Sequence, residues 1–261
     1  MAPVMRSVRD GRDHSAGRGL GNMEAAVSNI VLVHGAWSDG SSWQEVIAAL
    51  QDEGHRMLAV QLPLTSLEAD IAWTQRQIAT FDEPVTLVGH SYGGMVISAA
   101  AHQNAQVTAL VFIAAYAPDE SETIQMLSDR GAPTRGRAAI RFSEDGWSTI
   151  DPDLFGDALG ADLPATTTRI LAAVQKPTHS ACFSRPSGRG AWHDLPCAYV
   201  LSVDDQILDP GLQRWFAERA NATVTELPSS HLSMVSHPEE VAAAIGRMLR
   251  ERMSRSRRCA G

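Results

Sequence analysis

The chain has 261 residues, of which 44% are hydrophobic, enough to build one large domain around a sizeable core. Its formal net charge of −8 argues against a nucleic-acid-binding protein. No apolar run approaches the roughly 18 residues of a membrane-spanning helix, and the 3 cysteines have neither disulfide-framework nor metal-site spacing. We therefore expect a cytoplasmic protein that requires no metal and no other cofactor and binds neither nucleic acid nor membranes.

The two ends of the chain differ in composition from the rest. Residues 1–27 are rich in arginine and glycine without apolar periodicity, so we expect this extension to be disordered. Residues 251–261 are rich in arginine and form a basic tail after a last helix that should end at about Arg250. The folded domain is therefore predicted over residues 28–261.

Between these ends, short apolar runs alternate with amphipathic segments. The runs predict buried strands at 29–35, 56–62, 85–88, 107–115, 198–203 and 224–227. The amphipathic segments predict helices starting near Ser41, at the capping-box sequence of residues 65–68, and over 95–101, 211–220 and 238–250. This alternation predicts an α/β fold with a mostly parallel, doubly wound sheet flanked by helices.

The alternation stops between Pro118 and Pro196, where polar turns and short helix candidates such as Thr166–Val174 replace it. We interpret this segment as a cap inserted above the sheet. Its apolar residues exceed what a solvated loop needs, so some should line a closed apolar pocket. These residues include Ile124, Met126, Leu127, Leu154, Phe155, Leu159, Ile170, Leu171 and Phe183.

The third predicted strand leads into the sequence Gly89-His90-Ser91-Tyr92-Gly93, and a helix follows. Strand, Gly-X-Ser-X-Gly turn and helix form the context of a nucleophile elbow, in which the serine hydroxyl is exposed above the sheet. A Cβ atom at Gly89 or Gly93 would collide with its neighbours in so tight a turn. Ser91 is therefore the predicted nucleophile.

A serine nucleophile needs a base that a third group orients. In doubly wound sheets such groups follow the carboxyl ends of strands. Asp205 follows the strand at 198–203 and His231 follows the last strand, which gives the chain order Ser, Asp, His of the elbow fold. Asp204, the neighbour of Asp205, and Asp119, after the preceding strand, are alternatives for the acid.

Two backbone N–H groups are needed where negative charge develops on the substrate oxygen. One is predicted at Tyr92, directly after the nucleophile, and the other at Ala36, on the loop after the first strand. His34 on that loop is interpreted as a structural turn residue. Trp37 and Met234 are candidates for contact with the substrate.

The chain resembles the α/β-hydrolase superfamily, and within it the small esterases related to plant methylesterases and hydroxynitrile lyases. The segments that carry this resemblance are Val31–Trp37, Gly89–Gly94 and Ser230–Met234. The resemblance implies that Ser91, Asp205 and His231 form a catalytic triad and that Ala36 and Tyr92 are oxyanion donors. Hydroxynitrile lyases of this branch place a lysine directly after the catalytic histidine, where this chain has Leu232.

The sequence thus predicts a cofactor-independent serine carboxylesterase that hydrolyses small or short-acyl esters through an acyl-enzyme intermediate. One alternative is a lyase or cofactor-free oxygenase on the same fold. Another is a ligand-binding receptor or signalling protein of this fold with weak hydrolase activity.

Overall fold

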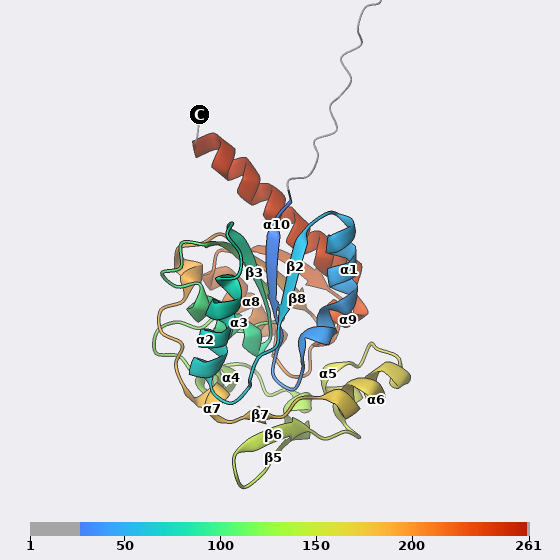
Figure 1. The fold of residues 1–261 in the computed structure, drawn as a ribbon. Helices are drawn as coiled ribbons and strands as arrows, with labels where there is room; N and C mark the ends of the chain where they lie inside the picture. The colour runs from blue at the N-terminus through green and yellow to red at the C-terminus, as the bar shows by residue number, and fades with distance from the viewer. Residues whose placement is uncertain (1–26, 260–261) are drawn as a thin grey trace, which may run out of the picture.

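The computed structural model describes residues 27–259 (Figure 1). A six-stranded sheet, in which every pair of neighbouring strands is parallel, has the order β2-β1-β3-β4-β8-β9. The strands are β1 (Asn29–Val33), β2 (Arg56–Val60), β3 (Val85–His90), β4 (Val107–Ile113), β8 (Cys197–Ser202) and β9 (Thr223–Leu227). The predicted parallel sheet is therefore confirmed.

Helices cover both faces of this sheet (Figure 1). Side chains alternate between the two faces along a strand, so Val31 and Val33 belong to one core cluster while Ile30 and Leu32 belong to the other. The first cluster packs under α2 (Leu67–Ile78), α3 (Tyr92–Ala100) and α8 (Pro210–Arg219). The second packs under α1 (Gln44–Asp52) and α10 (Pro238–Cys259).

Within residues 118–196, where the cap is predicted, residues 185–196 lead back to the amino end of β8, and Ala191 and Leu195 line a pocket with Val107, the first residue of β4. Most of residues 118–184 lie across the carboxyl ends of the parallel strands at the bottom of Figure 1. They contain a second sheet of three antiparallel strands, β5 (Ile140–Phe142), β6 (Trp147–Ile150) and β7 (Thr178–His179). The helices of the whole segment 118–196 are α4 (Ile124–Arg130), η2 (Arg135–Ala139), α5 (Phe155–Leu159), α6 (Ala165–Val174), α7 (Ala181–Ser184) and η3 (Ala191–His193). Two further short helices, η1 (Gly40–Trp43) and α9 (Ser233–Ser236), lie outside it.

Several helix ends differ from the prediction. Near Ser41, where a helix is predicted to start, the turn η1 is capped by Asp39, whose carboxylate accepts a hydrogen bond from the Ser41 amide, and α1 begins only at Gln44. At α2 the cap is Ser66, whose side chain accepts from the Ala69 amide, so the predicted capping box does not form. Helix α10 continues beyond Arg250 into the predicted tail, since residues 251–259 contain no glycine or proline and arginine favours helices.

The predicted disordered extension lies outside the described residues, except for Val27. Among the residues that the structure describes, none of the helices combines the length and the apolar character needed to cross a membrane.

Candidate active site

Ser91 occupies the turn between β3 and α3, with φ 51° and ψ −122°. This left-handed conformation is strained for a residue with a Cβ atom and persists only where the surroundings impose it. A Cβ atom at Gly89 would lie 2.6 Å from the carbonyl oxygen of Gly93, and one at Gly93 would collide with the carbonyl oxygens of Val33 and His34. The two glycines therefore allow the tight packing that holds Ser91 in this conformation.

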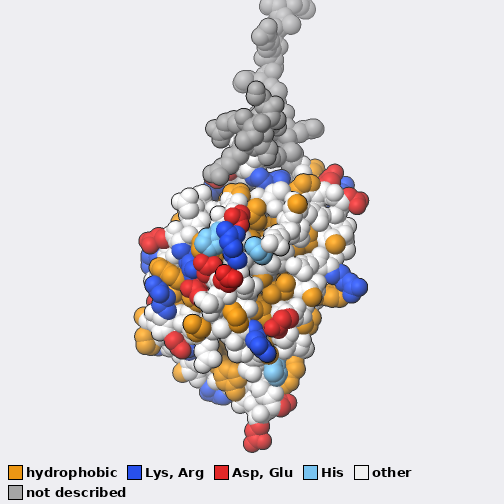
Figure 2. Space-filling model, turned by 90° about the vertical axis from the view of Figure 1, so that its left-hand side faces the viewer, with side chains coloured by type: hydrophobic (Ala, Val, Ile, Leu, Met, Phe, Trp, Pro, Cys, Tyr) orange, Lys and Arg blue, Asp and Glu red, His pale blue; other side chains and the backbone are white. Residues whose placement is uncertain are grey.

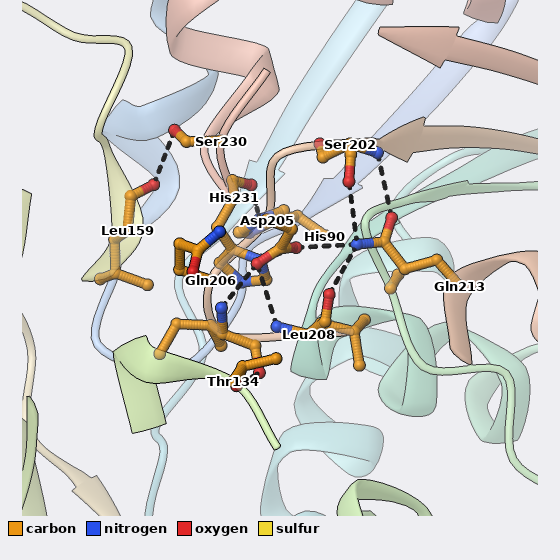
Figure 3. Close-up of polar contacts among 12 residues, drawn as sticks. His90, Thr134, Leu159, Ser202, Asp205, Gln206, Leu208, Gln213, Ser230 and His231 are labelled. Carbon is orange, nitrogen blue, oxygen red and sulfur yellow. Dashed lines mark hydrogen bonds and ion pairs between the residues drawn. The ribbon is translucent and has the colours of Figure 1, made fainter. Parts of the chain in front are cut away.

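His231 and Asp205 form a buried pair beyond the ends of β9 and β8 (Figure 3). The Nδ1 atom of His231 lies 2.6 Å from Oδ2 of Asp205. The other oxygen, Oδ1, accepts hydrogen bonds from the amides of Ile207 (2.8 Å) and Leu208 (3.0 Å). The side chain of Gln213 donates to Oδ2 at 2.9 Å. These donors fix the carboxylate, so it can hold the imidazole ring in one orientation.

The two other candidate acids lie elsewhere. Asp204 is exposed. Asp119 pairs with His193 (3.0 Å) and Arg219 (3.6 Å). Figure 2, which views the left-hand side of Figure 1, shows acidic, basic and histidine side chains gathered in one area of that face. Of the three acids, Asp205 is the one that the structure pairs with His231.

His90, the residue before Ser91, lies directly beside this pair (Figure 3). Its Nε2 donates a hydrogen bond to the backbone oxygen of His231 at 2.9 Å, and the two ring centroids are 4.6 Å apart. Burial, together with the neighbouring His231, lowers the pKa of His90 well below its usual value. His90 therefore stays neutral and supports the backbone that carries His231.

The side chains of Ser91 and His231 line two neighbouring cavities. No hydrogen bond joins the two side chains within residues 27–259. Catalytic hydrogen bonds are often long in enzymes without substrate and shorten in the reactive complex.

The loop after β1 passes close to the elbow. A Cβ atom at Gly35 would lie only 2.9 Å from the Cβ of Ser91, so the next residue, Ala36, is brought beside the serine. Tyr92 is the first residue of α3, and an amide at that position has no acceptor within its own helix. Among the described residues, neither the Ala36 amide nor the Tyr92 amide donates a hydrogen bond. Both can therefore donate to a substrate oxygen.

Buried side chains hold these two backbone segments in place. The Nδ1 atom of His34 donates a hydrogen bond to the backbone oxygen of Gly35 (2.8 Å), and its Nε2 accepts one from the amide of Leu62 (3.0 Å). Burial lowers the pKa of His34 to about 4. The Tyr92 hydroxyl donates to Oδ2 of Asp70 at 2.6 Å. Burial raises the pKa of Asp70 in spite of this hydrogen bond. His34 and the Tyr92 side chain are thus structural supports.

The larger cavity beside Ser91 has a volume of about 410 Å³. Its walls include Ala36, Trp37 and Tyr92, together with Ile124 and Phe183 from the cap. The smaller one, about 20 Å³, is lined by His90 and His231 together with the cap residues Phe155, Leu159 and Leu171. Met126 and Ile170, which are also apolar residues of the cap, are instead 58% and 64% exposed.

The two candidate substrate-binding residues differ in position. Trp37 lines both cavities. Its indole N–H donates a hydrogen bond to Ser148 Oγ (3.0 Å), and its backbone amide donates one to Thr178 Oγ1 (3.0 Å). These two bonds connect the loop after β1 to the cap sheet. Met234 is fully buried in the core cluster under α10 and lines neither cavity. The structure therefore places Trp37, but not Met234, at the cavities.

Two residues of the site were not singled out by the sequence. His90 is the first of the two variable residues of the Gly-X-Ser-X-Gly motif, and Arg137 is a cap residue that lines the larger cavity. Within the described part of the chain, no cluster of three or more His, Cys, Asp or Glu side chains could hold a metal ion.

The chain is similar in sequence and in fold to known hydrolases and esterases. A model described as "Alpha/beta hydrolase family" matches residues 30–244. The chain is 32% identical over 249 residues to the carbendazim hydrolyzing esterase of Nocardioides sp. (strain SG-4G), covering 84% of this chain and 100% of that protein. It is 24% identical over 253 residues to methylesterase 2 of Arabidopsis thaliana, covering 83% and 94%. The solved pyrethroid hydrolase from Sphingobium faniae JZ-2 has the same fold, with a TM-score of 0.75, 22% identity and coverage of 86% and 98%.

Proposed function

Because the chain belongs to the alpha/beta hydrolase family, we propose that it is a serine carboxylesterase that hydrolyses small, short-acyl esters through an acyl-enzyme. Its relatives include proteins named as esterases and hydrolases, which supports ester hydrolysis. The observation that carries the proposal is the strained Ser91 elbow, which opens into a cavity of about 410 Å³. We also propose a cytoplasmic location, in keeping with the free thiols of Cys182 and Cys197.

In the proposed first step, His231 removes the proton of Ser91 as the serine oxygen attacks the ester carbonyl. Asp205, 2.6 Å from Nδ1, keeps the imidazole proton on that nitrogen, so Nε2 is free to act as the base. The same pair stabilises the imidazolium ion that forms. Because Asp205 is held by three further donors, it does not have to reorient during the reaction.

The carbonyl oxygen becomes negatively charged when the serine attacks. The amides of Ala36 and Tyr92 donate to this oxyanion, and preorganised donors of this kind usually provide the largest single contribution to such catalysis. His231 then gives its proton to the leaving alcohol. Water attacks the acyl-enzyme with His231 again as base, which releases the acid and restores Ser91.

The test is the variant Ser91→Ala, assayed with p-nitrophenyl butyrate. Loss of the nucleophile should lower kcat by a factor on the order of 10⁶ without changing the melting temperature. Ser98→Ala is a matched control, since Ser98 is a buried residue of α3 whose hydroxyl has no hydrogen-bond partner among the described residues. A Ser91→Ala enzyme that keeps a tenth of the activity would refute the proposal.

A further inference from the structure

The larger cavity carries a single formal charge. Among the residues that line it, Arg137 is the one with an ionised side chain, and no aspartate or glutamate is present. Arg137 belongs to η2 in the cap, whereas Ser91 belongs to the central sheet, so the two reach the same cavity from different parts of the fold. An ester bound at Ser91 therefore lies in a cavity with a positive group in its wall.

The guanidinium group of Arg137 is only partly engaged by the protein. Its Nη1 donates to the backbone oxygen of Ser128 at 3.0 Å, and its Nη2 donates to Asp129 Oδ1 at 3.3 Å. An arginine has five N–H donors, so three of them have no partner among the described residues. The Asp129 side chain is 64% exposed, and an ion pair in such a place is weak. The cation is fixed in position but remains able to bind an anion.

On the cavity side, away from Asp129, neutral polar groups and apolar walls lie beside this cation. The hydroxyls of Tyr116 and Ser128 lie 2.7 Å apart, and both residues line the cavity with Arg137. Burial raises the pKa of Tyr116 to about 12, so its hydroxyl keeps its proton. Ile124, Ile140 and Ile207 supply apolar surface in the same cavity. The Arg137 side chain is 38% exposed, and a charge-assisted hydrogen bond on its cavity side is stronger than one between neutral groups.

We infer that Arg137 binds a carboxylate that belongs to the ester substrate, so the preferred substrates are hemiesters of short dicarboxylic acids. A guanidinium group matches a carboxylate with two parallel N–H···O bonds, which supplies orientation as well as affinity. The ester group is then held at Ser91 while the free carboxylate is held at Arg137. This inference rests on the proposed function.

The test compares two esters that differ only at one end. Methyl hydrogen glutarate carries a carboxylate where methyl pentanoate carries a methyl group, and the succinate and adipate hemiesters vary the length. The Arg137→Gln variant should lower kcat/KM for the best hemiester by about 10- to 100-fold, as expected for hydrogen bonds to a charged group. Its kcat/KM for methyl pentanoate should stay within about threefold of the wild-type value, because the neutral ester makes no such bond.

Two variants make the test specific. Arg141→Gln removes a cap arginine that pairs with Asp151 and does not line this cavity, so it should leave both esters unaffected. Asp129→Asn removes the competing carboxylate beside Arg137 and should raise the preference for the hemiester. An Arg137→Gln enzyme that loses activity equally on both esters would show a structural role and overturn the inference.

A binding measurement separates this inference from the proposed function. Glutarate is titrated calorimetrically into the Ser91→Ala variant and into the double variant Ser91→Ala/Arg137→Gln. Binding to the first and at least tenfold weaker binding to the second support the carboxylate site even if no ester is hydrolysed. Equal binding, or none to either protein, refutes the site even if neutral esters are hydrolysed.

Discussion

The imidazole of His231 lies 2.6 Å from the carboxylate of Asp205, and both residues are only 2% exposed although they are 26 positions apart in the chain. Each residue follows one of two neighbouring strands, β8 and β9, which run in parallel. The carboxyl ends of parallel strands lie at the same edge of the sheet, so the pairing of these strands brings the two side chains together.

This pairing predicts unequal effects at adjacent aspartates. Asp205→Asn should lower kcat by about 10⁴, because the amide no longer keeps the proton on His231 Nδ1. Asp204→Asn is the matched control and should change kcat by less than twofold or so, since Asp204 is exposed. Steady-state kinetics with one ester measures both. If Asp119→Asn proved the damaging change, the assignment of the acid would be wrong.

The cavity beside Ser91 predicts a limit on acyl length. We expect a pocket walled in part by the cap to discriminate by about 1–3 kcal/mol for each misplaced methylene, so acetyl to hexanoyl esters should react well and dodecanoyl esters poorly. We expect no activation at an oil–water interface. The measurement is kcat/KM for p-nitrophenyl esters of two to sixteen carbons. A maximum beyond ten carbons would indicate an open groove instead.

The elbow predicts that Gly93 cannot be replaced. In Gly93→Ala the new methyl group would meet the backbone oxygens of Val33 and His34, which cannot move without shifting β1. We expect a destabilisation of at least about 1–3 kcal/mol together with loss of esterase activity. Gly156→Ala is the control, because a Cβ at Gly156 makes only ordinary contacts with Thr168. Urea unfolding and the ester assay test the pair, and equal behaviour of the two variants would contradict the steric argument.

Asp162, on the cap between α5 and α6, accepts hydrogen bonds from the amide and the hydroxyl of Ser230, the residue before His231. Burial acts to raise the pKa of Asp162, but hydrogen bonds from Ser230 and Ser236 outweigh it, so the pKa is lowered. The ionised carboxylate therefore stabilises the fold above the usual aspartate pKa of 3.8, and this contribution is lost as the pH falls further.

The variant Asp162→Asn should accordingly lower the free energy of unfolding at pH 7 by about 1–3 kcal/mol. The difference from the wild type should shrink as the pH falls below 3.8, because the wild-type carboxylate then takes up its proton. Urea unfolding of both proteins at pH 7 and pH 3 measures this. A difference that stays constant with pH would mean that the charge of Asp162 contributes nothing.

The central sheet was predictable because its strands carry a strong local signal. The run Val107–Ile113 is almost continuously apolar, as expected of a strand buried on both faces, and its bounds agree with the prediction to within two residues. The cap sheet has no such signal, since β7 has 2 residues and β5 has 3. Strands this short show no periodicity, and they form because the cap folds back on itself.

The same distinction applies to the candidate site. Ser91 and His231 stand out because a motif and the ends of strands mark them. No local sequence motif identifies Arg137, because an arginine among polar residues of the cap is expected to be a solvated surface side chain. Only the path of the cap over the sheet brings it to the cavity of Ser91. The burial of Met234 likewise depends on the packing of α9 under α10, which periodicity does not reveal.

The order of the strands has a consequence for the newly made chain. The two strands that precede Asp205 and His231, β8 and β9, are synthesised after the whole cap. A nascent chain that ends before residue 197 contains the sequences of β1, β2, β3, β4 and the elbow, yet it lacks both Asp205 and His231. Under the proposed mechanism, esterase activity requires a chain that has been synthesised past His231, so shorter translation products have no esterase activity.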